Sequence, residues 1–192
     1  MPRQRKVIAY LATSADGFIA RPDGAVDWLD RPWPKGAYGM PRFLASVDTI
    51  VMGRKTYDFG RAHGGVATPG KRSIVLSRSL RPEEVEGAEL RRSVSRLARQ
   101  LRAEPGKHVW LLGGAEIFGA FLDAGELDEL MINVVPVLIG EGMPLLNPKR
   151  RTRALRLRSS QRFVDGVVRL TYEVAPPAAA RRARRSTRRS RA

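Results

Sequence analysis

Residues 109–118, which read VWLLGGAEIF, constrain the fold more than any other stretch of this chain. Four apolar residues in a row predict a strand buried on both faces, and the residues after the two glycines have the apolar spacing of a helix. A strand, a tight glycine turn and a helix in this order aim the free N–H groups of a helix N-terminus at the carboxyl end of a strand. That geometry favours an anion such as a diphosphate. A turn that merely connects the two elements is the alternative.

Strand and helix patterns alternate along the chain. Apolar runs typical of strands lie at 7–12, 49–52, 73–76, 109–112 and 127–135, and helical patterns lie at 41–47, from 57, at 94–103 and from 115. Residues 13–38 are expected to form a long ordered loop. The pair Asp165-Gly166, between 154–164 and 167–174, predicts a terminal hairpin. The pattern predicts an α/β fold with a mainly parallel central sheet and an antiparallel C-terminal hairpin.

The end of the chain differs in composition from the rest. Pro176-Pro177 stops the last strand, so one domain is expected over 1–176 and a disordered Arg-rich tail over 177–192. The tail carries seven arginines and no acidic residue, and the net charge of the whole chain is +16. Alternation in the first hairpin strand places Arg156 and Arg158 on one face. Non-specific nucleic-acid binding through these arginines therefore stays open as a second class of function.

Composition excludes several classes of protein. The 192-residue chain has no cysteine, which excludes disulfides and thiolate metal sites and suits a reducing cytoplasm, the predicted location. Its two histidines, His63 and His108, are too far apart in the sequence to suggest a metal site, and none is predicted. No apolar run approaches the roughly 20 residues that span a bilayer, and no signal peptide is visible.

Three predicted strands end in groups that suit phosphate. They are Gly53-Arg54-Lys55-Thr56, Ser77-Arg78 and Gly113-Gly114-Ala115. Ligands of a parallel α/β sheet bind outside the carboxyl ends of its strands, so the three segments are expected at one edge. Guanidinium groups bind phosphate in a bidentate fashion, so Arg54 and Arg78 suit a phosphorylated dinucleotide. The Gly-x-Gly-x-x-Gly fingerprint is absent, which excludes an ordinary Rossmann domain.

In this order the three segments resemble the dihydrofolate reductase-like superfamily. Residues 12–20, ATSADGFIA, and 136–142, PVLIGEG, are most similar to the C-terminal reductase domain of the bifunctional riboflavin-biosynthesis deaminase–reductase. The resemblance covers roughly residues 6–175. It implies a three-layer dihydrofolate reductase-like fold, a homodimer, and NADPH as hydride donor to a small heterocycle or ribosylamine, as in 5-amino-6-(5-phosphoribosylamino)uracil reductase. Without cysteine the chain cannot supply the usual zinc ligands of a deaminase, so a stand-alone reductase is expected.

The resemblance also implies roles for individual residues. Ala12 and Ile19 would lie beside the nicotinamide. The phosphates and the adenosine 2′-phosphate would be bound by Gly53, Arg54, Lys55, Thr56, Ser77 and Arg78. The diphosphate would lie on Gly113, Gly114, Ala115, Glu116 and Ile117. Trp28 and Phe43 are candidates to line a substrate pocket, with ordinary core packing as the alternative.

The proton donor is where the family pattern breaks. Classical dihydrofolate reductases carry a carboxylate early in the helix that here contains Phe43, but residues 38–40 read YGM and hold no acid. True dihydrofolate reduction is therefore the alternative rather than the first hypothesis. Reduction of an imine needs a proton from a side chain or through water. Asp16, Asp27 and Asp30 are candidates, and the catalytic residue stays unassigned.

Overall fold

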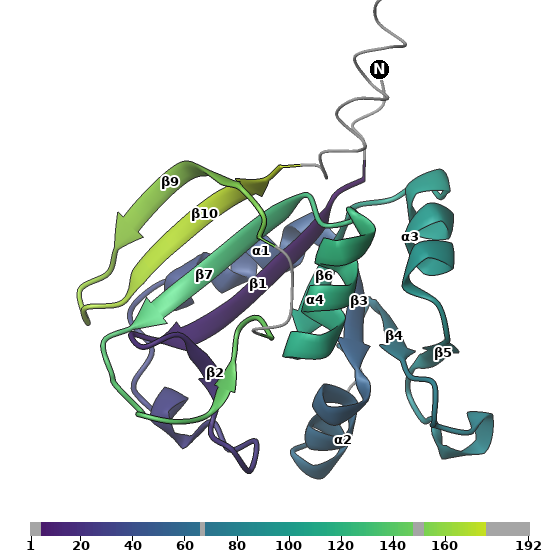
Figure 1. The fold of residues 1–192 in the computed structure, drawn as a ribbon, viewed down its shortest axis with the longest axis horizontal. Coiled ribbons are helices and arrows are strands. Elements are labelled where there is room, and N and C mark those ends of the chain that lie inside the picture. The colour runs from purple at the N-terminus through teal and green to yellow at the C-terminus, as the bar shows by residue number, and fades with distance from the viewer. Residues whose placement is uncertain (1–4, 66–67, 148–151, 176–192) are drawn as a thin grey trace, which may run out of the picture.

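The alternating pattern folds into one eight-stranded sheet in the computed structural model, which describes residues 5–65, 68–147 and 152–175. The strand order is β5-β4-β3-β6-β1-β7-β10-β9 (Figure 1). The strands are β1 (Val7–Ser14), β3 (Val47–Gly53), β4 (Arg72–Leu76), β5 (Glu89–Arg91), β6 (His108–Gly113), β7 (Glu129–Val135), β9 (Leu155–Arg162) and β10 (Val168–Val174).

Strand directions confirm the expected fold class. Every pairing from β5 through to β7 is parallel, and β10 is antiparallel both to β7 and to β9. The hairpin turns at Asp165 and Gly166, as its Asp-Gly signal predicts. The predicted boundary at 176 and the tail 177–192 lie outside the described residues.

Four α-helices cover the two faces of the sheet over the described ranges. They are α1 (Met40–Ser46), α2 (Arg54–Ala62), α3 (Val94–Ala103) and α4 (Ala115–Ala124). Leu97 and Leu101 of α3 and Phe118 and Phe121 of α4 share one apolar core, whereas Phe43 of α1 belongs to a separate cluster on the opposite face. Figure 1 shows α3 and α4 in front of the sheet and α1 behind it. The three-layer arrangement is therefore confirmed.

Some elements differ from the sequence-based expectation. The second helix begins at Arg54 instead of Tyr57, so the residues GRKT lie at its N-terminus rather than in a connecting loop. The 13–38 segment is not one loop, because β1 extends to Ser14 and the segment holds β2 (Phe18–Ala20) and two short 3-10 turns, Asp27–Leu29 and Ala37–Gly39. Strand β2 pairs with β8 (Met143–Pro144) in a small second sheet. These strands are too short to leave a periodic pattern.

Hydrogen bonds hold the loops at the carboxyl edge of the sheet in place. Asp16 accepts the backbone N–H groups of Ile139 and Gly140, at 3.1 and 2.8 Å, so the loop after β1 is tied to the loop after β7. No helix in the described part of the chain is both long and apolar enough to cross a membrane.

Candidate active site

The N-termini of α2 and α4 meet at the carboxyl edge of the sheet. Gly53 ends β3, and a Cβ atom placed on it would lie 2.6 Å from Cγ1 of Ile117 in α4. A Cβ on Gly114 would lie 3.7 Å from the Thr56 hydroxyl in α2. Because the first turn of each helix leaves backbone N–H groups without intrahelical acceptors, the two helices present donors to the same place.

Gly113 opens this place to a ligand. Its φ of +121° is a conformation that side-chain-bearing residues rarely adopt, and nothing lies within 4 Å of a Cβ built on it. The peptide bond between Gly113 and Gly114 is cis. The space above the turn that follows β6 is therefore free, as an anion-binding turn requires.

The basic segments join the same edge. Arg54 donates from Nη1 to the Ser79 hydroxyl at 2.9 Å, which links the start of α2 to the segment after β4. Ser77 is buried, and its hydroxyl accepts the N–H groups of Ser79 and Leu80, so its side chain shapes the turn. Arg78 is exposed and makes no ion pair within the described ranges. The structure thus brings together the three segments that the sequence separates.

The strands β1 and β6 part near their carboxyl ends. Their pairing ends at Ala9 and Leu111. Beyond that point β1 continues beside β7, where Ala12 pairs with Asn133, and β6 continues beside β3 to Gly113. Ile19, half-buried, lies in β2, which packs against β1. An opening between two diverging parallel strands is where a flat ring enters a doubly wound sheet.

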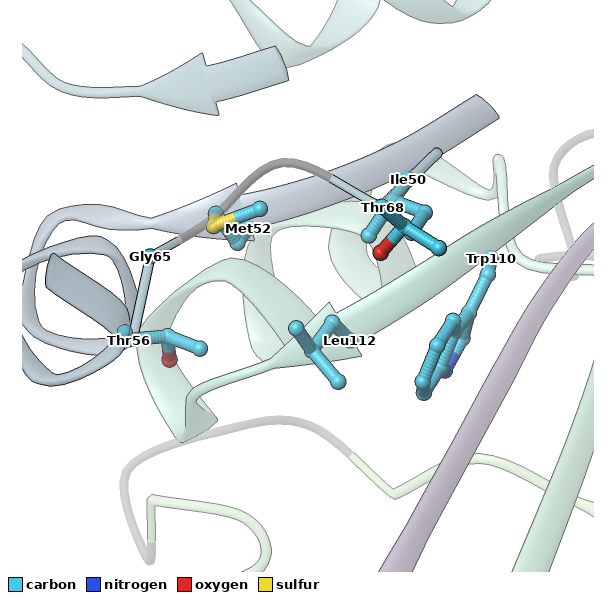
Figure 2. Close-up of a pocket in the computed structure, with 8 residues that line it drawn as sticks. Ile50, Met52, Thr56, Gly65, Thr68, Trp110 and Leu112 are labelled. Atoms are coloured by element: carbon cyan, nitrogen blue, oxygen red, sulfur yellow. The ribbon is translucent and has the colours of Figure 1, made fainter. Parts of the chain in front are cut away.

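A cavity of about 160 Å³ lies on the face of the sheet that α1 and α2 cover (Figure 2). Figure 2 shows Thr56 at the start of α2 and Trp110 on β6 at its two ends. The lining residues are mostly apolar: Ile50, Met52, Thr56, Gly60, Gly65, Thr68, Trp110 and Leu112. Thr56 and Leu112 also adjoin the glycine turn, so the cavity is continuous with the edge that the helices α2 and α4 define.

Neither aromatic residue proposed for the substrate pocket lines this cavity. Phe43 is buried, with its ring edge-to-face to Tyr10 at 4.7 Å and to Trp110 at 5.5 Å, so it supports the cavity wall from behind. Trp28 is half-buried in the first 3-10 turn, and its indole Nε1 is enclosed without a hydrogen-bond partner among the described residues. Phe43 thus belongs to a hydrophobic core cluster, whereas the role of Trp28 stays a prediction.

Two of the three aspartates considered as proton donors, Asp16 and Asp27, are held by hydrogen bonds or an ion pair. Hydrogen bonding with Ser14 and with the backbone at 139–140 holds the pKa of Asp16 below its ordinary value. Asp27 pairs with Arg21 at 2.6 Å, which lowers its pKa in the same way. Asp30 is exposed. None of the three lines the cavity. The lowered pKa values of Asp16 and Asp27 favour the ionised carboxylate, which cannot donate a proton.

Sequence reasoning missed a polar centre on the same face of the sheet. Arg169 of β10 is buried, its Nε donates to Oδ1 of Asn133 at 3.0 Å, and its Nη2 donates to the hydroxyl of Tyr10 and to the carbonyl of Tyr38. A Cβ on Gly39 would lie 3.5 Å from Nη1 of Arg169. A cation therefore occupies the neighbourhood where the dihydrofolate reductase pattern would place a carboxylate. The sequence signal for this polar centre is the position of Arg169 between two apolar residues of β10.

The fold is that of a dihydrofolate reductase-like α/β domain, and the candidate ligand-binding edge lies at the ends of β3 and β6. The model of the family described as RibD C-terminal domain matches residues 5–169, so the chain belongs to that family. The uncharacterized protein YwjB of Bacillus subtilis is 34% identical over 172 residues, which are 85% of this chain and 95% of that protein.

Solved structures agree with this assignment. A putative riboflavin biosynthesis protein from Shewanella sp. PV-4 superposes with a TM-score of 0.78 at 27% identity, over 88% of this chain and 99% of that one. Two more distant structures share the fold. A deaminase/5-amino-6-(5-phosphoribosylamino)uracil reductase of Thermotoga maritima has TM-score 0.65 at 19% identity, over 90% of this chain and 57% of that one. Dihydrofolate reductase of Enterococcus faecalis, complexed with NADP(H), has a TM-score of 0.67 at 16% identity, over 91% of this chain and 99% of that one.

Proposed function

We propose that the protein is an NADPH-dependent reductase that transfers a hydride to a small heterocycle or ribosylamine. The observation that carries the proposal is the meeting of the α2 and α4 N-termini at Gly53, Gly114 and Ile117, beside an apolar cavity. The riboflavin-related and NADP(H)-bound names among the similar structures support the reaction class and the cofactor.

The residues of the edge fit NADPH. The open turn at Gly113 leaves room for a diphosphate, and the N–H groups at the start of α4 are donors suited to it. Arg54, Lys55 and Arg78 are exposed cations that suit the 2′-phosphate, with Arg54 already oriented by Ser79. When bound, NADPH would supply the hydride. Ala12 and Ile19 would border its ring on the β1 side, and Leu112 on the β6 side.

On the substrate side, the residues that line the cavity serve mainly to exclude water, because few of them carry groups that could take part in the reaction. Ile50, Leu112 and the Trp110 ring present apolar surface. The polar side-chain groups of the described lining are the hydroxyls of Thr56 and Thr68 and the indole Nε1 of Trp110, which donates to the Tyr10 carbonyl at 3.0 Å. The proton that accompanies the hydride therefore arrives from a hydroxyl or through water, because no carboxylate belongs to that lining.

The alternative functions fit the described residues less well. Dihydrofolate reduction is disfavoured, because the region near Gly39 faces the guanidinium of Arg169 rather than a carboxylate. Nucleic-acid binding through the hairpin is weakened, because Arg156 and Arg158 both bond to the carboxylate of Glu173. The Arg-rich tail falls outside the described residues, so nucleic-acid binding through the tail stays a prediction.

We further propose a homodimer built on the outer strand β9. All eight residues of β9 are exposed, and Leu155 and Leu157 present 42% and 54% of their surface on the face opposite Arg156. Exposed leucines on an edge strand are an unusual liability unless another chain covers them. Light scattering after size-exclusion chromatography should give a dimer for the wild type and a monomer for Leu157→Lys. A monomeric wild type would refute this.

The decisive experiment for the enzymatic proposal is a titration with NADPH, followed by nicotinamide fluorescence, with NADH as the matched comparison. NADPH is expected to bind in the micromolar range and more tightly than NADH. Binding of neither cofactor below about millimolar concentration would remove the reductase proposal. Truncation after residue 175 tests the tail separately: it should leave cofactor binding intact and remove any salt-dependent DNA binding.

A further inference from the structure

Arg169 is a buried cation without a carboxylate beside it. Only 9% of the residue is exposed, yet it makes no ion pair with any Asp or Glu in the described part of the chain. Its guanidinium instead meets an amide, a phenol and a carbonyl, belonging to Asn133, Tyr10 and Tyr38. Its charge also lies over the rings of Tyr10 and Phe163, at 4.9 and 5.2 Å. A cation withdrawn from water is costly unless a negative charge approaches it.

One nitrogen of this guanidinium remains available. Nη1 of Arg169 makes no hydrogen bond to any described residue, and it is not among the enclosed polar atoms that lack a partner, so it reaches solvent. Its neighbour is the backbone of Gly39, with no side chain between them. The guanidinium is therefore held by two of its nitrogens and leaves the third for a ligand.

The segment that borders this nitrogen has an unusual backbone. Gly36, Ala37, Tyr38 and Gly39 follow one another with φ values of 85°, 44°, 53° and 70°. Two non-glycine residues in the left-handed region are unfavourable and persist only where their surroundings hold them. Here the backbone carbonyl of Tyr38 accepts a hydrogen bond from Arg169, and the side-chain hydroxyl of Tyr38 donates to Asp165 in the hairpin turn. Backbone of this kind is concentrated at ligand-binding sites.

The polar centre lies next to the proposed hydride-transfer site. Tyr10 precedes Ala12 by two residues on β1, so both side chains project from the same face of the sheet. Asn133 is the direct strand partner of Ala12. A group bound at Arg169 would thus belong to a molecule lying beside Ala12.

We propose, building on the function proposed above, that Arg169, held by Tyr10 and Asn133, recognises a carboxylate of the substrate, which is therefore a heterocyclic acid rather than a neutral heterocycle. A single open nitrogen between the rings of Phe163 and Tyr10 offers few donors. Such a site suits a singly charged, planar carboxylate better than a phosphate, which has three strong acceptor oxygens.

The test compares acids with their neutral amides of equal shape. Orotate against orotamide, and pyrazine-2-carboxylate against its carboxamide, are titrated into the full-length protein by calorimetry, with and without saturating NADPH. Each acid is expected to bind the wild type at least tenfold more tightly than its amide. Arg169→Gln should bind acid and amide alike, and Arg156→Gln, which removes an exposed arginine of the same hairpin, should keep the preference.

A second variant covers the case in which Arg169→Gln does not fold. Asn133→Asp places a carboxylate beside Nε of Arg169 and so supplies the missing negative charge from within the chain. It should weaken binding of the acids more than tenfold and leave the amides unaffected. Acids that bind no better than amides to the wild type, or a preference that survives Asn133→Asp, would overturn the proposal. Failure to bind NADPH would remove the reductase function instead, because the titrations without cofactor still decide the acid preference.

Discussion

Gly53 and Ile117 are in direct contact where β3 ends and α4 begins. A Cβ on Gly53 would lie 2.6 Å from Cγ1 of Ile117, a separation that real Cβ atoms essentially never show. Any side chain at position 53 must therefore displace the Ile117 side chain or the first turn of α4 that carries it. The close approach of the two helix N-termini that form the proposed phosphate site consequently depends on the absence of a side chain at position 53.

Gly53→Ala should weaken cofactor binding and lower stability together. We expect the dissociation constant for NADPH to rise at least tenfold, a loss of about 1.4 kcal/mol. Overpacking of this kind costs about 1–3 kcal/mol of unfolding free energy. Calorimetric titration and thermal denaturation measure the two effects. In the double variant with Ile117→Ala the clash is gone, so both losses should shrink. Unchanged binding by the single variant would show that this contact does not set the site.

Arg78→Gln should change the choice between the two nicotinamide cofactors. Arg78 is exposed at the end of β4 and makes no ion pair in the described ranges, so its charge is available to a 2′-phosphate. Charge-assisted hydrogen bonds are worth about 1.5–3 kcal/mol, so NADPH affinity should fall about tenfold or more while NADH affinity stays the same. Arg81→Gln is the control, because that nearby arginine pairs with Glu83 and Glu84. An equal loss for both cofactors would assign Arg78 to the diphosphate or to the fold.

The sequence predicts the long elements of this fold because their apolar patterns are continuous. The helix at 94–103 matches α3 to the residue, since Ser93 caps it by accepting the N–H of Arg96 and Leu97 and Leu101 mark its buried face. Strand β5 and the β2–β8 pair span only two or three residues each, too few to show a period of two. Their formation depends on partners distant in the sequence.

The residues of the candidate site likewise fall into those with a local sequence signal and those that depend on distant partners. Glycines and cations directly after buried strands are local signals, so the sequence alone predicts the edge formed by Gly53, Arg54 and Gly114. It does not predict the polar centre, because Tyr10, Asn133 and Arg169 come from three strands that meet only in the folded sheet. The aspartates in residues 13–38 are candidate proton donors by sequence because their tertiary partners, such as the N–H groups of Ile139 and Gly140, are invisible there.

Acid should destabilise the protein partly through Asp48. Partial burial alone would raise the pKa of this carboxyl, but hydrogen bonds from the Lys107 N–H, Thr49 and Arg5 outweigh it, so the pKa is lowered. A carboxyl whose pKa is depressed by folding contributes stability above its unfolded pKa, and this contribution is lost as the pH falls through the folded value. Urea denaturation should therefore show stability falling below about pH 4.

Asp48→Asn should remove part of this acid dependence. We expect a loss of about 1 kcal/mol at pH 7, since the carboxylate is partly exposed while its partner Arg5 is buried. The slope of stability against pH below about pH 4 should become shallower than in the wild type. Glu83→Gln, which removes an exposed carboxylate from the 3-10 turn Pro82–Glu84, is the matched control and should leave the slope unchanged. An Asp48→Asn variant with the full wild-type slope would place the acid sensitivity elsewhere.

High pH should lower the folding stability of the protein partly through ionisation of Tyr38. Burial raises the pKa of its hydroxyl to about 12, with further contributions from the hydrogen bond to Asp165 and from the negative charge of that carboxylate. Because folding raises this pKa above its unfolded value near 10, the stabilisation is complete below about pH 10 and disappears as the pH rises toward 12. Tyr38→Phe should lose stability at neutral pH yet show a flatter decline above pH 10, measured by urea denaturation at fixed ionic strength.

Asp165→Asn keeps the Tyr38 phenol but removes the charge that opposes its ionisation, so absorbance at 295 nm should show Tyr38 titrating at lower pH than in the wild type. Identical alkaline titrations of Asp165→Asn and the wild type would mean that Asp165 does not raise the pKa of the Tyr38 hydroxyl.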